Sequence, residues 1–240
     1  MSIKRLCDAF EPIQRANTGE ELRREMERFA KQMGFDRYVY ALKITAPSLI
    51  PQEYLLSGYP EGWVSRYVSR GYFKIDPIVR QCEHSTLPVL WDEHMMTEED
   101  ASEFWEEAHS FGLRAGLSFT VREQPGVTGI LSLSRDQSIE LEEPELAAII
   151  GRAQVFASVL HYAVARIDLP RLIPQASIPL TARERECIKW AADGKTAWEI
   201  GKILGITERT AIFHTNNITR KLGAVNKTQA IVRALALNLV

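Results

Sequence analysis

The spacing of apolar residues predicts both helices and strands in the first two thirds of the chain. Leu22, Met26 and Phe29 recur at helical spacing, and Thr18 with Glu21 fits a capping box before them. Segments 37–44, 52–57, 115–122 and 128–135 are rich in branched and aromatic residues, which is typical of strands. Further helices are expected around 63–68, after Asp76-Pro77, and over 101–112 and 144–167. Together these elements indicate an α+β fold with a largely antiparallel sheet.

The C-terminal part of the chain has a different pattern, in which short helices follow polar caps. Thr181 with Glu184 and Thr196 with Glu199 each fit a capping box. In the second of these helices the spacing places Ala197, Ile200, Ile203 and Leu204 in the core. Gly205 ends that helix, and Thr207 then caps a third one. A short helix, a tight glycine turn and a second capped helix form the helix-turn-helix pattern.

Periodicity assigns one face of the third helix to the core and the other to a partner. Ala211, Thr215, Ile218 and Leu222 follow the core spacing. The opposite face and the residues around it are polar, basic or exposed apolar, which suits the major groove and flanking phosphates of double-stranded DNA. The predicted DNA-binding residues are Lys195, Thr196, Thr207, Arg209, Thr210, Ile212, Phe213, Asn216, Arg220, Lys221 and Lys227. The alternative is a small interaction bundle with a solvated basic face.

The fourth helix, expected over 228–239, is apolar on most sides. A helix of that kind is either deeply buried or part of a dimer seam. Because four short helices cannot bury it on every side, we expect a homodimer.

The charge distribution changes where prolines cluster. The formal net charge of the 240 residues is only −2, which by itself argues against nucleic acid. Residues 1–170 carry 18 Lys and Arg against 26 Asp and Glu, whereas residues 171–240 carry 11 against 5. Pro170, Pro174 and Pro179 favour an extended linker close to this change. We therefore predict a sensor domain at 1–167, a linker at 168–178 and an all-α four-helix domain at 179–240.

Other classes of protein are disfavoured by what the sequence lacks. The three cysteines show no CxxC spacing, which suggests a reducing compartment and no zinc site. The first residues show no apolar core of a signal peptide, and no run of about 18 apolar residues suggests a membrane span. Nucleophile elbows, phosphate loops and HExxH are not found. We expect a cytoplasmic protein that is not an enzyme and has no metal or cofactor.

Residues 180–230 resemble the DNA-binding half of the LuxR-type quorum-sensing transcription factors. This segment reads LTARERECIKWAADGKTAWEIGKILGITERTAIFHTNNITRKLGAVNKTQA. In the first half, the order and spacing of certain residues resemble the family's acyl-homoserine-lactone-binding domain. These residues are Tyr59, Trp63, Tyr67, Asp76-Pro77, Trp91, Gly116 and the GILSLSR segment. The resemblance implies an α-β-α sandwich around a signal molecule, a linker and a dimeric helix-turn-helix.

The resemblance also implies individual roles. Trp63 is expected to donate to the lactone carbonyl and Asp76 to accept from the amide N–H, while Tyr59 and Ser132 donate to the amide carbonyl. Aromatic and aliphatic walls complete the predicted ligand site. These walls are Tyr67, Trp91, Phe104, Ala108 and Leu113.

Each of these residues also has a plain structural interpretation. Asp76 can be only an N-cap before Pro77, Trp63 and Tyr67 can be core packing, and Ser132 can be an ordinary strand serine. The chemistry nevertheless suits a homoserine lactone, because an amide and a lactone in an apolar pocket need one acceptor and a few neutral donors. Val64 and Ile78 are apolar, so they give no support to a 3-oxo signal.

The leading hypothesis is a quorum-sensing regulator that binds an N-acyl-homoserine lactone and, as a dimer, a pseudo-palindromic DNA site. The alternative keeps the DNA-binding regulator but has an aryl or plant-derived ligand, or none. Glu98, Glu99 and Asp100 are candidates for a contact with RNA polymerase, with a solvated face as the competing interpretation.

Overall fold

The computed structural model describes residues 10–44, 52–91, 102–124, 126–172, 179–237 and 239–240. Within it the chain divides into two compact units. The first unit comprises Met1–Leu42, Glu53–Arg122 and Thr128–Ile167, and the second contains Asp168–Val240 with the short stretches Lys43–Gln52 and Glu123–Val127.

A five-stranded sheet forms the middle of the N-terminal unit. Its strands are β1 (Arg37–Ile44), β2 (Gln52–Ser57), β3 (Val89–Leu90), β4 (Ala115–Gln124) and β5 (Val127–Arg135). They lie in the order β2-β1-β5-β4-β3, and β3 pairs antiparallel with β4. The antiparallel sheet predicted from the sequence is therefore confirmed.

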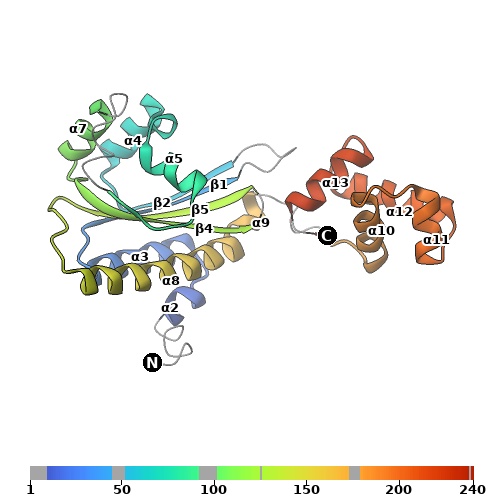
Figure 1. The fold of residues 1–240 in the computed structure, drawn as a ribbon, viewed down its shortest axis with the longest axis horizontal. Helices are drawn as coiled ribbons and strands as arrows, with labels where there is room; N and C mark the ends of the chain where they lie inside the picture. The colour runs from blue at the N-terminus through green and yellow to red at the C-terminus, as the bar shows by residue number, and fades with distance from the viewer. Residues whose placement is uncertain (1–9, 45–51, 92–101, 125, 173–178, 238) are drawn as a thin grey trace. The chain divides into compact units, whose positions relative to one another are not determined.

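Helices cover both faces of this sheet (Figure 1). On one face lie α4 (Glu61–Arg70), the 3₁₀ turn η1 (Tyr72–Lys74), α5 (Pro77–His84) and α7 (Ser102–Ser110). On the other face lie α3 (Gly19–Gln32) and α8 (Glu143–Ile167), next to the short α2 (Glu11–Arg15). The unit is thus the expected α-β-α sandwich.

The layer formed by α3 and α8 is a closed aromatic core. Phe156 of α8 stacks on Phe29 of α3 with ring centroids 3.9 Å apart, and Phe10 meets both rings edge-on. On β1, Tyr40 is buried and its hydroxyl lies 2.7 Å from Nδ1 of His161. Because every second residue of β1 packs into this core, the residues between them face the opposite layer.

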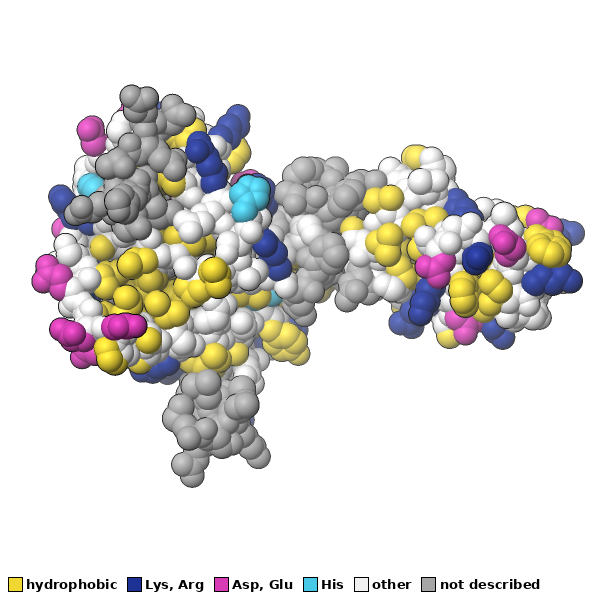
Figure 2. All heavy atoms as spheres, in the orientation of Figure 1, with side chains coloured by type: hydrophobic (Ala, Val, Ile, Leu, Met, Phe, Trp, Pro, Cys, Tyr) yellow, Lys and Arg dark blue, Asp and Glu magenta, His cyan; other side chains and the backbone are white. Residues whose placement is uncertain are grey.

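By length and hydropathy alone, α8 is apolar enough to cross a membrane. Its side chains Phe156, Leu160 and Val164 are instead buried in the core just described. Figure 2 shows further apolar side chains gathered on the surface over this helix.

Two local details differ from the sequence-based expectations. The Thr18 side chain caps α3, but the Glu21 carboxylate accepts from the N–H of Asn17 rather than from that of Thr18, so the box is displaced by one residue. The expected linker begins with a helical turn, α9 (Leu169–Leu172), in which Leu169 is buried. Pro170 fits there because the first turn of a helix needs no N–H donor.

The C-terminal part contains α10 (Ala182–Ala192), α11 (Ala197–Leu204), α12 (Glu208–Lys221) and α13 (Lys227–Ala236). Both predicted capping boxes are present, at Thr181 with Glu184 and at Thr196 with Glu199. Gly205 has φ 64°, a left-handed conformation that favours glycine, and it turns the chain from α11 towards α12. This all-α helix-turn-helix unit completes the predicted α+β fold class.

Candidate functional site

A cavity of about 130 Å³ lies between the sheet and the helices α4, α5 and α7. All nine residues predicted to bind a ligand line it, from Tyr59 on the β2–α4 connection to Ser132 on β5. Ten further lining residues were not predicted. They are Val39, Ala41, Leu55, Ser57, Val64, Val68, Ile78, Val79, Trp105 and Ile130.

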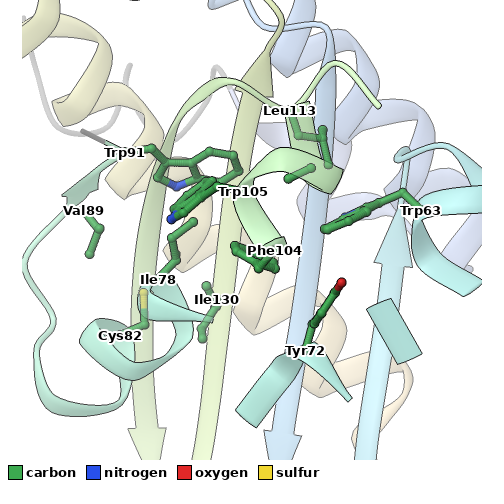
Figure 3. Close-up of a cluster of buried hydrophobic side chains, with 11 residues drawn as sticks. Trp63, Tyr72, Ile78, Cys82, Val89, Trp91, Phe104, Trp105, Leu113 and Ile130 are labelled. Atoms are coloured by element: carbon green, nitrogen blue, oxygen red, sulfur yellow. The ribbon is translucent and has the colours of Figure 1, made fainter. Parts of the chain in front are cut away.

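Aromatic side chains make up much of the cavity lining, and several of them belong to the buried cluster shown in Figure 3. Trp63 is 3% exposed, and its ring meets those of Tyr67, Tyr72 and Phe104 at centroid distances of 5.7–5.9 Å. On the other side of Phe104, the ring centroids of Trp105 and Trp91 lie 6.0 Å apart. The core-packing interpretation of Trp63 and its expected place in the cavity wall are thus both correct. Trp63 lines the cavity, and because an indole N–H can only donate, it is a candidate donor to a ligand.

Asp76 brings a carboxylate into this apolar wall. One oxygen, Oδ1, caps α5 by accepting from the N–H groups of Ile78 at 2.8 Å and Val79 at 3.3 Å. The other, Oδ2, accepts from the hydroxyl of Tyr67 at 2.8 Å. The N-cap interpretation of Asp76 is therefore correct, and the same side chain also borders the cavity.

Burial controls the protonation of this part of the site. It raises the pKa of Asp76 from 3.8 to about 6, although the hydrogen bonds from Tyr67, Ile78 and Val79 act in the opposite direction. Burial and the nearby Asp76 charge raise the pKa of the Tyr67 phenol well above its usual range, and burial does the same for Tyr59. At neutral pH the cavity therefore offers the Asp76 carboxylate as an acceptor and the protonated Tyr59 phenol as a donor, whereas the Tyr67 proton is already donated to Asp76.

A second polar group lies on the strands. The Trp91 indole Nε1 donates to Oγ of Ser118 at 2.9 Å, and Ser118 Oγ lies 2.8 Å from Oγ of Ser132. Trp91 reaches this position because residue 116 is glycine. A Cβ there would lie 2.6 Å from the Leu133 carbonyl oxygen and 2.8 Å from the Trp91 ring, so a larger residue would displace the indole.

Charged side chains join the two helices that cover the cavity. Glu107 of α7 accepts from Arg66 of α4 at 2.7 Å and from the hydroxyl of Tyr72 at 2.8 Å. Arg70 of α4 adds an ion pair with Glu103 at 2.7 Å. These contacts hold α4 and α7 together above Trp63 and Phe104.

Half of the lining residues that sequence reasoning missed lie on the strands of the sheet, and the other half lie on α4, α5 and α7. Val39 and Ala41 alternate with the buried Tyr38, Tyr40 and Leu42 along β1, so they point into the cavity layer. Strict alternation could have identified the pair, but both faces of this strand are apolar, and the pattern alone does not say which face meets the ligand layer.

In the helix-turn-helix, the predicted faces of α12 are observed. Ala211, Thr215 and Ile218 are buried, whereas Ile212 is 44% and Phe213 is 59% exposed. Other predicted DNA-binding residues that are exposed are Thr196, Thr207, Arg209, Asn216, Arg220 and Lys227, while Lys195, Thr210 and Lys221 are partly buried. Ile203 differs from its expected core position because it is 45% exposed. It occupies the outer side of the short helix α11, where four helices leave it uncovered.

Two of the lysines that were predicted to bind phosphate have hydrogen-bond partners inside the domain. The Lys221 ammonium lies 2.7 Å from Oε2 of the buried Glu184 and also donates to the Pro179 carbonyl at 3.1 Å. The Lys227 ammonium donates to the carbonyl of Lys195 at 3.2 Å. Burial alone would raise the pKa of Glu184, but the hydrogen bonds from Lys221 and Thr181 hold it below its usual value. Lys221 thus contributes to the stability of the domain.

No cluster of three or more metal-ligating side chains occurs within the described ranges. Cys82 and Cys187 are buried free thiols there.

Comparison with known proteins connects the two units to known families. Residues 18–164 match the autoinducer binding domain, and residues 178–234 match the bacterial regulatory proteins of the luxR family. The transcriptional activator protein SolR of Ralstonia nicotianae is 35% identical over 97% of this chain and 98% of its own. The quorum-sensing regulator RhlR of Pseudomonas aeruginosa is 33% identical over 90% of this chain and 88% of its own.

Solved structures give the same result. SdiA in complex with octanoyl-rac-glycerol matches with a TM-score of 0.82 at 30% identity, covering 98% of this chain and 94% of SdiA, which is an Escherichia coli protein. CepR2 from Burkholderia cenocepacia, an N-acylhomoserine lactone dependent factor, matches with a TM-score of 0.56 at 31% identity over 71% of this chain and 97% of its own.

These relatives are regulators of transcription and not enzymes, in agreement with the sequence-based expectation. The two family matches span most of the chain, and SolR and RhlR are similar to it over nearly their full length. The chain therefore belongs to the LuxR family of quorum-sensing transcriptional regulators, with an autoinducer-binding domain followed by a DNA-binding helix-turn-helix domain.

Proposed function

We propose that this regulator binds an N-acyl-homoserine lactone in the cavity of its first domain and, as a homodimer, a pseudo-palindromic promoter site. The observation that carries the proposal is the position of the Asp76 carboxylate, which is buried in the wall of a mostly apolar cavity and is the only ionised side chain among its lining residues as the structure describes them. A buried carboxylate costs free energy unless hydrogen-bond donors satisfy it. A ligand with an amide N–H supplies one more donor.

The remaining polar groups suit the rest of such a ligand. In the proposed arrangement the Trp63 indole donates to the lactone carbonyl, while Tyr59 and Ser132 donate to the amide carbonyl. Val39, Ala41 and the other apolar lining residues accommodate the acyl chain.

The proposed division of labour follows the chain: a sensor at 1–167, a linker at 168–178 and a DNA-binding domain at 179–240. In the last of these, the exposed face of α12 enters the major groove. Asn216 is then placed to read an adenine, and Ile212 or Phe213 to contact a thymine methyl. Arg209 and Arg220 bind phosphates.

Dimerisation and location are further parts of the proposal. Apolar side chains on the surface over α8 and the 49% exposed Leu235 of α13 are consistent with a second copy covering them. The protein is proposed to be cytoplasmic. The candidate polymerase contacts Glu98, Glu99 and Asp100 lie outside the described residues.

The test is to express the full chain with a mixture of N-acyl-homoserine lactones and to identify the co-purified lipid by mass spectrometry. We expect one lactone in about stoichiometric amount with the wild type and none with Asp76→Ala. An Asp136→Asn variant serves as control, because that carboxylate is on the surface and pairs with Arg114.

A second candidate ligand class is an acylglycerol, since the SdiA structure contains octanoyl-rac-glycerol. A glycerol hydroxyl could replace the amide N–H as the donor to Asp76. Recovery of an acylglycerol and no lactone, even with lactones supplied, would contradict the first proposal and support the second.

A further inference from the structure

Three side chains form a short hydrogen-bond relay behind the cavity wall. Trp91 and Ser132 line the cavity, whereas Ser118 does not, and it is completely buried between them. The relay runs from Trp91 Nε1 to Ser118 Oγ over 2.9 Å and from there to Ser132 Oγ over 2.8 Å. Ser118, which does not line the cavity, therefore connects two residues that do.

Counting protons gives the relay a direction. An indole N–H can only donate, so the Ser118 oxygen accepts from Trp91. Within the described part of the chain, Ser132 is the side-chain partner left for the proton of Ser118. If Ser132 donated instead, the Ser118 proton would be buried without an acceptor, which is unfavourable. Ser118 therefore donates to Ser132.

This direction determines what Ser132 can offer a ligand. Its oxygen is already accepting from Ser118, and its own proton is free to point into the cavity that it borders. Asp76 has the opposite role to Ser132, because an ionised carboxylate can only accept hydrogen bonds. One donor and one acceptor in the same cavity match the C=O and N–H of an amide.

We propose that Ser118 is a positioning residue that fixes Ser132 as the donor to the carbonyl oxygen of the signal's amide. The inference rests on the proposed function and adds a determinant of specificity to it, namely selection for a strong carbonyl acceptor at this position. It also gives Trp91 a polar role beyond that of an aromatic wall.

The experiment compares two probes on the full-length protein, N-octanoyl homoserine lactone and its thioamide analogue. Sulfur accepts hydrogen bonds more weakly than oxygen, so the ratio of the two dissociation constants reports all hydrogen bonds donated to this atom, and the change in the ratio when Ser118 is replaced reports the contribution of Ser132. The variants are Ser118→Ala, Ser118→Thr and Trp91→Phe. The matched control is Thr120→Val, which removes another buried hydroxyl from β4 that does not line the cavity.

We expect Ser118→Ala to weaken binding of the amide probe about tenfold and to change the thioamide probe far less. The hydroxyl of Ser118→Thr should restore the preference for the amide, and Thr120→Val should leave it at the wild-type value. If Ser118→Ala does not fold, the dissociation constants of the same two probes are measured for Trp91→Phe instead. That variant keeps an aromatic wall but removes the donor, and we expect it to lose the preference as well.

Failure of the relay and failure of the proposed function give different results. A wild type that binds the amide probe, together with Ser118→Ala or Trp91→Phe variants that keep its full preference over the thioamide, would overturn the relay alone. A wild type that binds neither probe and that also retains no lactone from the mixture of N-acyl-homoserine lactones would overturn the proposed function, and the ligand-directed role of Ser118 with it.

Discussion

Replacing Asp76 by asparagine should remove a pH-dependent penalty on the stability of the unliganded protein. Burial raises the pKa of this carboxyl from 3.8 to about 6. Each pKa unit corresponds to about 1.4 kcal/mol, so keeping the group ionised in the folded state at neutral pH costs about 3 kcal/mol. Asparagine has almost the same shape and can still cap α5, because its oxygen can accept from Ile78 and Val79.

The sign of the pH dependence follows from the direction of the shift. Because the folded state has the higher pKa, it binds the Asp76 proton more tightly than the unfolded state does. The contribution of Asp76 to stability is therefore fully present below about pH 4 and is lost as the pH rises to about 6. Relative to Asp76→Asn, the wild type should lose about 3 kcal/mol of unfolding free energy between pH 4 and pH 7.

Urea unfolding of the unliganded full chain, followed by tryptophan fluorescence at several pH values in this range, measures the difference. Asp136→Asn is the control, since that side chain is 63% exposed and its replacement should not change the pH dependence. Parallel pH profiles for the wild type and Asp76→Asn would refute the reasoning, because they would mean that the carboxylate is not penalised by burial.

Three further predictions concern neighbouring contacts and the second domain. Tyr67→Phe removes the donor to Asp76 Oδ2, so the pKa of that carboxyl should rise further, and the pH range over which the unfolding free energy falls, measured by urea unfolding, should extend to higher pH. Lys221→Met leaves the buried Glu184 carboxylate unpaired and should lower the unfolding free energy by about 3 kcal/mol; an unchanged urea midpoint would contradict this. Arg220→Gln should weaken binding to all DNA sequences and reduce the slope of log K against log salt by about one, measured by fluorescence anisotropy.

Much of the fold followed from local patterns. Most of the helices, the strands β1, β2, β4 and β5, and both capping boxes of the C-terminal domain were predictable because caps, glycine turns and periodicity act over a few residues; β3 and α2 were not predicted. The prediction that Ile203 is in the core was wrong because it rested on local spacing alone. Spacing gives a side chain a face of its helix, but whether that face is covered depends on the other helices.

The candidate site was predictable in part. The nine predicted lining residues came from the resemblance to a family and not from periodicity, and the cavity contains them all. Val39 and Ala41 were missed because β1 is apolar on both faces. Ser118 was missed because its partners Trp91 and Ser132 lie 27 and 14 positions away in the chain.

The sequence by itself determined which side chains can ionise and approximately where most of the helices lie, since residue type, caps and periodicity are local properties. It therefore placed a basic helix-turn-helix after an acidic α+β domain. Only the tertiary structure decided what each polar group contacts. Lys221 forms an ion pair with Glu184, and Asp76 is both a helix cap and an acceptor in the cavity wall. Ser118 is buried beside Ser132, with which it forms a hydrogen bond. Burial and distance determine the pKa of a carboxyl and the direction of a hydrogen bond, and both arise only when distant segments pack together.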